Sequence, residues 1–314
     1  CSHLFEGLYI WSAGEVYRTH FQRYPVIFLT FKDLKPTTLE QWNAGIGALL
    51  GQLYLDHQDL PGMTAMAPIE VRKFQAVIDQ VADETTQREA LKNLMGWLRR
   101  RHGERVVVLI DEYDTPIHAG FLGGFGEQVM GFFRVFLGAA LKDNNDLFKG
   151  VLTGILRVAK ENIFSGLNNL EVYSLLRREH AESFGFTESE VEGLLERAGQ
   201  REHLEVVRQW YNGYQFGDTV IYNPWSVLNF VKHELKLPQP YWINTSSNDL
   251  VRELLMQHAL SVEQDMLRLL EGTPIEKPVD ENVVLSRVKE DASSLWSLLL
   301  FTGYLKATRL PVEA

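Results

Sequence analysis

Three short apolar stretches, separated by longer stretches with helical spacing, constrain the fold of this chain most strongly. The apolar stretches are Pro25–Phe31, Val106–Ile110 and about Phe148–Ile155. Strands that read as continuous apolar runs are typical of parallel sheets that are buried on both faces. The alternation of such strands with helices predicts an α/β fold with a parallel sheet.

Helices are predicted around these strands from the spacing of apolar residues. In the first half, we expect helices that open at Thr37–Thr38, run from about Glu70, end near Arg99–Arg101, and span Val129–Leu141. The run Arg99–Arg101 suits the negative end of a helix dipole, so we interpret it as a helix end rather than a DNA-binding patch. Gly120–Gly126 matches no phosphate-binding loop, and we expect a flexible hinge or tip there.

After Ser174 the pattern changes from strands to capped helices. Asn223 and Pro224 form an N-cap followed by proline at the first helical position. A strand expected at Tyr304–Arg309 gives the end of the chain the look of a winged-helix module. The predicted helices are Glu188–Ala198, Leu204–Tyr211, Trp225–Leu235, Asp249–His258, Glu263–Leu270 with a capping box at Ser261–Gln264, and Ala292–Phe301.

The length and composition are those of a folded protein with two or three compact units. Of the 314 residues, 45% are hydrophobic, and 41 acidic against 31 basic side chains give a net charge of −10. This acidity argues against a surface given over to nucleic acid, although a local basic patch stays open. We expect an α/β core over residues 1–180, a helical lid over 181–237 and a winged-helix-like segment over 238–314. Pro238–Pro240 would be the linker between the last two.

Cysteine content and hydropathy limit the kinds of site and the cellular compartment that we expect. Cys1 is the only cysteine, which excludes an internal disulfide and a Cys-based structural zinc site. No apolar run approaches the roughly 18 residues of a transmembrane helix, so no membrane partner is expected. A single thiol fits a reducing compartment, and we expect a cytoplasmic protein. A leading Cys also opens mature bacterial lipoproteins. We favour the alternative that a piece of a longer chain begins at this residue.

The sharpest chemical signal is the apolar strand Val106–Ile110 followed by Asp111 and Glu112. This is the Walker B pattern of P-loop ATPases, in which a strand carries an Asp to the edge of the sheet where ligands bind. There Asp111 would bind Mg²⁺, and Glu112 would orient or deprotonate the water that attacks the γ-phosphate of ATP. The alternative is a strand that simply ends in an acidic helix cap.

Two further residues follow the third predicted strand. Thr153 stands at the strand end, where such ATPases carry a polar residue that senses phosphate; the alternative is a threonine that only caps the strand. Arg157 lies four positions later, close enough to contact phosphate or to reach a neighbouring subunit's site as an arginine finger. The alternative is an ordinary surface arginine.

Several longer segments make the sequence similar to one family. The chain resembles the bacterial AAA-ATPase-like proteins, P-loop ATPases that often carry a PD-(D/E)XK nuclease-like domain at the C-terminus. The resemblance covers essentially the whole chain and implies ATP and Mg²⁺ as ligands, a homo-oligomer as one form of assembly, and nucleic acid as a partner only through the nuclease-like region. The matching segments are Leu4–Leu8, Asp111–Ile117, Leu152–Arg157, Ile163–Leu170, Trp210–Phe216, Ile221–Ser226, Tyr241–Ser246 and Trp296–Tyr304.

The sequence departs from this family at both ends. Family members carry an upstream phosphate-binding loop with a Gly-Lys-Ser core, and this sequence contains no Gly-Lys-Ser or Gly-Lys-Thr. It also shows no Pro-Asp…(Asp/Glu)-x-Lys constellation after Tyr304. Two interpretations follow: the sequence is part of a longer ATPase, which we favour, or it is a degenerate ATPase that serves as a nucleotide-independent scaffold for protein or nucleic acid. In either case we expect this stretch alone to bind ATP–Mg²⁺ poorly.

Overall fold

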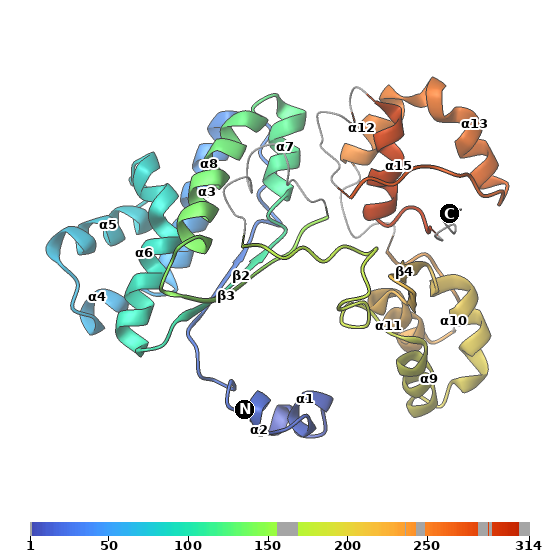
Figure 1. Cartoon of the computed structure of the whole chain (residues 1–314), viewed down its shortest axis with the longest axis horizontal. Helices are drawn as coiled ribbons and strands as arrows, with labels where there is room; N and C mark the ends of the chain where they lie inside the picture. The colour runs from blue at the N-terminus through green and yellow to red at the C-terminus, as the bar shows by residue number, and fades with distance from the viewer. Residues whose placement is uncertain are drawn as a thin grey trace. The chain divides into compact units, whose positions relative to one another are not determined.

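The computed structural model describes residues 2–155, 169–235, 237–242, 249–281, 288 and 291–307. The chain divides into two compact units, which meet in sequence between Asn169 and Leu170 (Figure 1). The first unit holds an α/β layer and the second is mainly helical. No helix among these residues has both the length and the apolar character that a membrane span requires.

The first unit is built on a three-stranded parallel sheet in the order β1-β2-β3. Its strands are β1 (Val26–Thr30), β2 (Val106–Asp111) and β3 (Leu147–Leu152). The expected parallel α/β arrangement is therefore confirmed, although each strand differs slightly from the predicted range. Because the strands are parallel, all three carboxyl ends lie at the same edge of the sheet.

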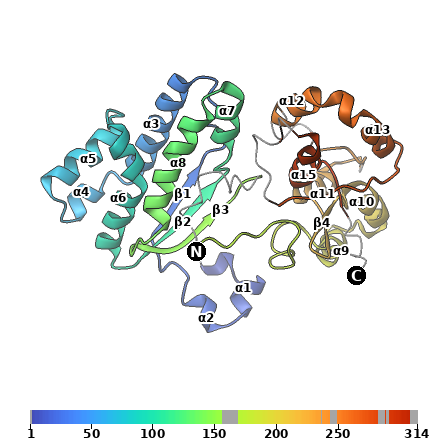
Figure 2. The same ribbon diagram turned by 45° about the horizontal axis from the view of Figure 1, so that its top comes forward.

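Helices α3 (Leu39–Leu55), α6 (Glu84–His102) and α8 (Gly126–Leu141) gather on one face of this sheet (Figure 2). Ile27 and Leu29 of β1 point to the covered side and are buried. Phe31, just beyond β1, meets Phe133 of α8 edge to face at 5.0 Å, a favoured geometry for aromatic pairs. The helical elements of this unit are η1 (Ser2–Leu4), α1 (Tyr9–Ser12), α2 (Glu15–Arg18), α3 (Leu39–Leu55), α4 (Leu60–Met63), α5 (Pro68–Ile78), α6 (Glu84–His102), α7 (Thr115–Gly123) and α8 (Gly126–Leu141).

The opposite face of the sheet is much more open. Val26 and Phe28 of β1 are 50% and 59% exposed, whereas their strand neighbours on the helix side are buried. Side chains alternate between the two faces along a strand, and residues paired across parallel strands share a face. Thr30 and its register partner Asp111 therefore end the open face.

The basic run at the end of α6 lies in its last turn, as expected. Each of its arginines also pairs with a carboxylate from another segment. Arg99, Arg100 and Arg101 contact Asp146, Glu70 and Asp59 at 2.8, 2.7 and 2.7 Å. The run therefore ties α6 to its neighbours, and its charges are engaged within the unit.

The prediction of a flexible loop at Gly120–Gly126 is wrong. Helix α7 continues to Gly123 and α8 begins at Gly126, so only two residues separate them. Gly124 ends α7 in the left-handed conformation, with φ 79°, which glycine adopts without steric cost. A Cβ on Gly120 would lie 3.2 Å from the Cα of Gly126. The glycines therefore allow a tight helix–helix connection.

The second unit contains helices near most of the predicted positions, together with a hairpin that the sequence analysis missed. The hairpin pairs β4 (Tyr214–Phe216) with β5 (Thr219–Ile221) in antiparallel fashion around Gly217 and Asp218. Helix and strand bounds are α9 (Glu188–Arg197), η2 (Arg201–His203), α10 (Leu204–Tyr211), β4 (Tyr214–Phe216), β5 (Thr219–Ile221), α11 (Pro224–Lys232), α12 (Asp249–Gln257), α13 (Ala259–Leu270) and α15 (Ala292–Phe301).

Two details of this unit correct the sequence analysis. Helix α13 begins at Ala259, so Ser261 lies inside the helix, where its hydroxyl donates to the carbonyl of His258. The predicted capping box at Ser261–Gln264 is therefore wrong. Tyr304–Ala307 forms no strand, and the rest of the segment expected as a strand lies outside the described residues.

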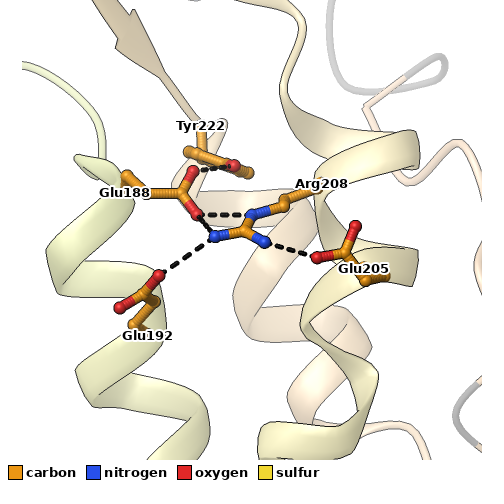
Figure 3. A network of polar contacts seen from close by, with 5 residues as sticks. All are labelled: Glu188, Glu192, Glu205, Arg208 and Tyr222. Carbon is orange, nitrogen blue, oxygen red and sulfur yellow. Dashed lines mark hydrogen bonds and ion pairs between the residues drawn. The ribbon is translucent and has the colours of Figure 1, made fainter.

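A polar network joins α9, α10 and Tyr222, the residue that follows β5, at the surface of the second unit (Figure 3). Arg208 donates to Glu188 at 2.6 Å and contacts Glu192 at 3.0 Å, and it also pairs with Glu205. Tyr222 donates its hydroxyl to Glu188. Hydrogen bonds to these carboxylates raise the pKa of Arg208, and burial raises the pKa of Tyr222. The network holds α9, α10 and the residue after β5 together around one guanidinium.

The segment that contains Pro238 and Pro240 is hydrogen-bonded to α10 and α11. The Tyr211 hydroxyl donates to the Gln239 carbonyl at 3.2 Å and accepts from the Gln239 N–H at 3.1 Å. Trp225 donates its indole N–H to the Tyr241 carbonyl at 3.2 Å. These bonds fasten the expected linker to the helices that precede it.

Replacing Tyr211 with Phe is expected to loosen this segment without unfolding the unit. The change removes both hydrogen bonds to Gln239. Each contributes about 0.5–1.5 kcal/mol, so chymotrypsin cleavage near Tyr241 should accelerate by about 5- to 150-fold. Limited proteolysis followed by mass spectrometry measures the rate. Tyr214→Phe, which removes a phenol hydroxyl from β4, is the control and should leave the rate unchanged. Equal rates for wild type and Tyr211→Phe would contradict this account.

Candidate functional site

A carboxylate between two hydroxyls occupies the carboxyl edge of the sheet. Asp111 ends β2, Thr30 ends β1, and Thr153 follows β3 directly. Thr153 donates its Oγ1 hydroxyl to Asp111 Oδ1 at 2.6 Å, and Thr30 donates to Asp111 Oδ2 at 3.3 Å. The structure therefore brings together Asp111 and Thr153, as their positions at two strand ends predict, and adds Thr30.

The carboxylate keeps acceptor capacity in this arrangement. Each oxygen of an ionised carboxylate has about two lone-pair sites, and each Asp111 oxygen receives one threonine hydroxyl. Asp111 is half-buried and Thr153 is exposed, so solvent reaches this edge. The backbone N–H of Lys32 also donates to Thr30 Oγ1 at 3.3 Å, which orients that hydroxyl toward Asp111.

Glu112 adopts an unusual backbone conformation at the next position. Its φ is 51°, in the left-handed region that a residue with a side chain rarely adopts. Its carbonyl accepts the N–H of Thr115, and its Oε2 accepts the Thr115 hydroxyl at 3.1 Å. The sharp turn at Glu112 lets the chain leave β2 and start α7 at once, with the carboxylate held at the first turn of that helix.

A second aspartate, Asp114, lies beneath this edge. It is 1% exposed, and its Oδ2 accepts the backbone N–H of Ile155 at 2.8 Å. His118 Nε2 lies 3.5 Å from the same oxygen. Burial lowers the pKa of His118, and the charge of Asp114 only partly opposes this shift.

No role for Thr30 or Asp114 was expected from the sequence alone. The sequence nevertheless contains a signal for each residue. Thr30 stands at the end of the first strand, in the same way that Thr153 stands at the end of the third. Asp114 lies within Asp111–Ile117, one of the segments that resemble the family. Arg157, the predicted phosphate contact or arginine finger, lies outside the described residues. The matching segment Ile163–Leu170 is described only at its last two residues.

The donor atoms at this edge suit a hard cation that is bound together with phosphate. Within the described ranges, no three His, Cys, Asp or Glu side chains gather into a metal site. Mg²⁺ typically takes one or two protein carboxylates and completes its octahedral shell with phosphate oxygens and water. Asp111 supplies such a carboxylate, and Thr30 and Thr153 supply hydroxyl oxygens next to it. The residues present therefore fit a magnesium nucleotide better than a metal held by protein alone.

Comparison with known proteins gives one family and one relative. The model of a family described as predicted AAA-ATPase matches residues 1–164. An uncharacterized protein from the vnfD 5′ region of Azotobacter chroococcum mcd 1 is 28% identical over 263 residues. The alignment covers 81% of this chain and 46% of that relative, so the chain spans less than half of the relative's length. No solved structure matches the chain.

The backbone at Glu112 yields a stability prediction that does not depend on activity. Glu112→Ala and Glu112→Gly both remove the carboxylate, but only glycine adopts the left-handed conformation without steric cost. Glu112→Gly should therefore be the more stable variant by about 1 kcal/mol, as measured by urea unfolding. The same pair at Glu104, just before β2, is the control and should not favour glycine. An alanine variant as stable as the glycine variant would contradict the positive φ.

Proposed function

Because the chain belongs to the predicted AAA-ATPase family, we propose that it forms the hydrolytic core of an ATPase that binds ATP with Mg²⁺ at the carboxyl edge of its sheet. Membership of this family indicates an ATPase-like function and nucleotide binding with a metal. The observation that best supports the proposal is the position of Asp111 between the hydroxyls of Thr30 and Thr153.

Asp111 is the proposed ligand of Mg²⁺. A bound magnesium ion would neutralise charge on the phosphate oxygens. The two threonine hydroxyls hold the carboxylate in one orientation and leave lone pairs for the ion or its water ligands. Because Asp111 ends the open face of the sheet, a nucleotide can approach without displacing the packed helices on the other side.

Glu112 is the proposed residue that orients or deprotonates the attacking water. Its carboxylate accepts one hydrogen bond from Thr115 and keeps further acceptor sites for water. Thr153 is the proposed phosphate sensor. The residue is exposed, and its hydroxyl can donate to a phosphate oxygen in place of the Asp111 carboxylate. Arg157 stays a proposal from the sequence, either as a phosphate contact in the same subunit or as a finger in a homo-oligomer.

Turnover would drive a change between the α/β core and the helical region. The polypeptide leaves β3 at Thr153 and continues to the second unit, so a residue that responds to phosphate stands at the start of the connection. We propose that residues 181–237 act as the lid and 238–314 as a winged-helix-like segment. Control of an associated nuclease-like domain is proposed from the family resemblance alone.

A nucleotide-independent scaffold is the second candidate, because these 314 residues contain no Gly-Lys-Ser or Gly-Lys-Thr. In P-loop ATPases, the phosphate-binding loop with this Gly-Lys-Ser or Gly-Lys-Thr core binds the β-phosphate through its backbone N–H groups and its lysine. On this alternative the fold persists without the chemistry, and the helical part binds protein or nucleic acid.

We expect the 314-residue chain alone to bind ATP–Mg²⁺ weakly and to hydrolyse it negligibly, because this sequence supplies no such phosphate loop. Titration calorimetry with and without Mg²⁺ measures the binding. Magnesium-dependent affinity in the micromolar range would overturn this expectation. The product of the complete gene is the matched comparison, and tight binding there favours the ATPase over the scaffold.

In the product of the complete gene, the neighbours Asp111 and Glu112 should have separable roles. Glu112→Gln removes the base but keeps the shape, so ATP binding should persist while turnover falls by about 10²- to 10⁴-fold. Asp111→Asn removes a charge from the proposed Mg²⁺ site and should weaken magnesium-dependent binding as well. Glu104→Gln, which alters a carboxylate that pairs with Arg23 near the opposite edge of the sheet, is the control. Wild-type turnover in both Glu112→Gln and Asp111→Asn would contradict the proposal that this pair is catalytic.

A further inference from the structure

The buried carboxylate of Asp114 lies below the exposed edge and contacts the segment that carries Thr153. Burying an ionisable group is costly unless it is hydrogen-bonded. One partner of Asp114 is a backbone group of that segment, the N–H of Ile155 at 2.8 Å. This position suits a structural support for the edge better than a direct contact with nucleotide.

Gly154 shows how closely the two segments fit. A Cβ on this residue would lie 2.7 Å from Asp114 Oδ1 and 2.8 Å from Cε1 of Tyr113. Real Cβ atoms essentially never approach other heavy atoms so closely. The Asp114 carboxylate is therefore in direct contact with the backbone between Thr153 and Ile155, on the side where any other residue would carry a side chain.

The contacts along this junction form a continuous series. The Thr153 N–H donates to the Ile110 carbonyl at 2.8 Å, and the Tyr113 N–H donates to the Thr153 carbonyl at 3.2 Å. The Thr153 hydroxyl then reaches Asp111, and the Ile155 N–H reaches Asp114. Past the end of the regular β3 pairing, the Asp114 carboxylate takes the place of a neighbouring strand.

We propose that Asp114 is a positioning residue, whose carboxylate fixes the backbone of Thr153–Ile155 and so places the Thr153 hydroxyl at the carboxyl edge of the sheet, next to Asp111. The inference deepens the proposed ATPase function and rests on it for any effect on turnover. Its structural part concerns only the junction between β2, α7 and the segment after β3. Asp114 itself does not touch the nucleotide in this proposal.

The first test is hydrogen exchange at the Ile155 amide in the product of the complete gene. Asp114→Ala removes the acceptor and should speed exchange at Ile155 by about tenfold, the equivalent of one hydrogen bond. Asp114→Asn keeps an acceptor oxygen and should restore most of the protection. Asp146→Asn, which breaks an ion pair with Arg99 before β3, is the matched control and should leave exchange at Ile155 unchanged. Unchanged exchange in Asp114→Ala would overturn the proposal.

The second test is a double-mutant cycle on turnover. If Asp114 acts through Thr153, Asp114→Ala should slow turnover in the wild type but add less than about twofold to Thr153→Val, because two changes on one path are not additive. Additive losses would overturn the positioning role, and equal losses in Asp114→Asn and Asp114→Ala would do so as well.

Two safeguards keep these tests decisive. Should Asp114→Ala fail to fold, Gly154→Ala pushes a methyl group against the same carboxylate and should give the same faster exchange and non-additive turnover. A wild-type protein without turnover would contradict the proposed ATPase, while the exchange measurement would still decide whether Asp114 holds the segment.

Discussion

Parallel pairing of β1, β2 and β3 is the constraint on which the candidate site depends. It places the ends of three strands, separated by long stretches of sequence, at one edge. Only with this pairing can hydroxyls from Thr30 and Thr153 both reach Asp111. An antiparallel neighbour would bring its amino end to this edge and would place its final residue at the other end of the sheet.

The same edge combines a half-buried carboxylate, Asp111, with a fully buried one, Asp114. Asp111 faces hydroxyls and solvent, whereas Asp114 is buried against the backbone after β3 and beside His118. Glu112, with its positive φ, turns the chain sharply between Asp111 and Asp114. The two carboxylates therefore have different surroundings although they lie only three positions apart in the sequence. This division suits a site in which one acid contacts the ligand and another fixes the residues around it.

Much of the fold could be predicted from the sequence, because strands and helices leave local patterns. The apolar runs Pro25–Phe31 and Val106–Ile110 are short and rich in β-branched and aromatic residues, which favours strands over helices. Asn223 and Pro224 likewise mark the start of α11, where the Asn223 side chain accepts the Ser226 N–H. Gly120–Gly126 was mistaken for a flexible loop because glycines that permit close helix contact have the same composition as glycines in a hinge.

The candidate site was only partly predictable for a different reason. Asp111 and Thr153 each follow a recognisable strand, so their meeting follows from parallel pairing. The contact between Thr30 and Asp111 depends on the strand order, which the sequence does not reveal. The contact between Asp114 and the backbone after β3 depends on its side chain being buried, which the sequence does not show either. The short hairpin of β4 and β5 was missed because three-residue strands are too brief to show a period.

The central claim, that Asp111 and its two threonines bind the magnesium nucleotide, can be tested by replacing Mg²⁺ with paramagnetic Mn²⁺. In the product of the complete gene with ATP, the methyl NMR signals of Thr30 and Thr153 should broaden strongly. Thr64, which follows α4 and stands next to the Ala65 carbonyl held by the last turn of α6, should be affected far less. Asp111→Asn should abolish the broadening at both threonines. Unbroadened Thr30 and Thr153 signals, with ATP and Mn²⁺ bound elsewhere, would contradict this account.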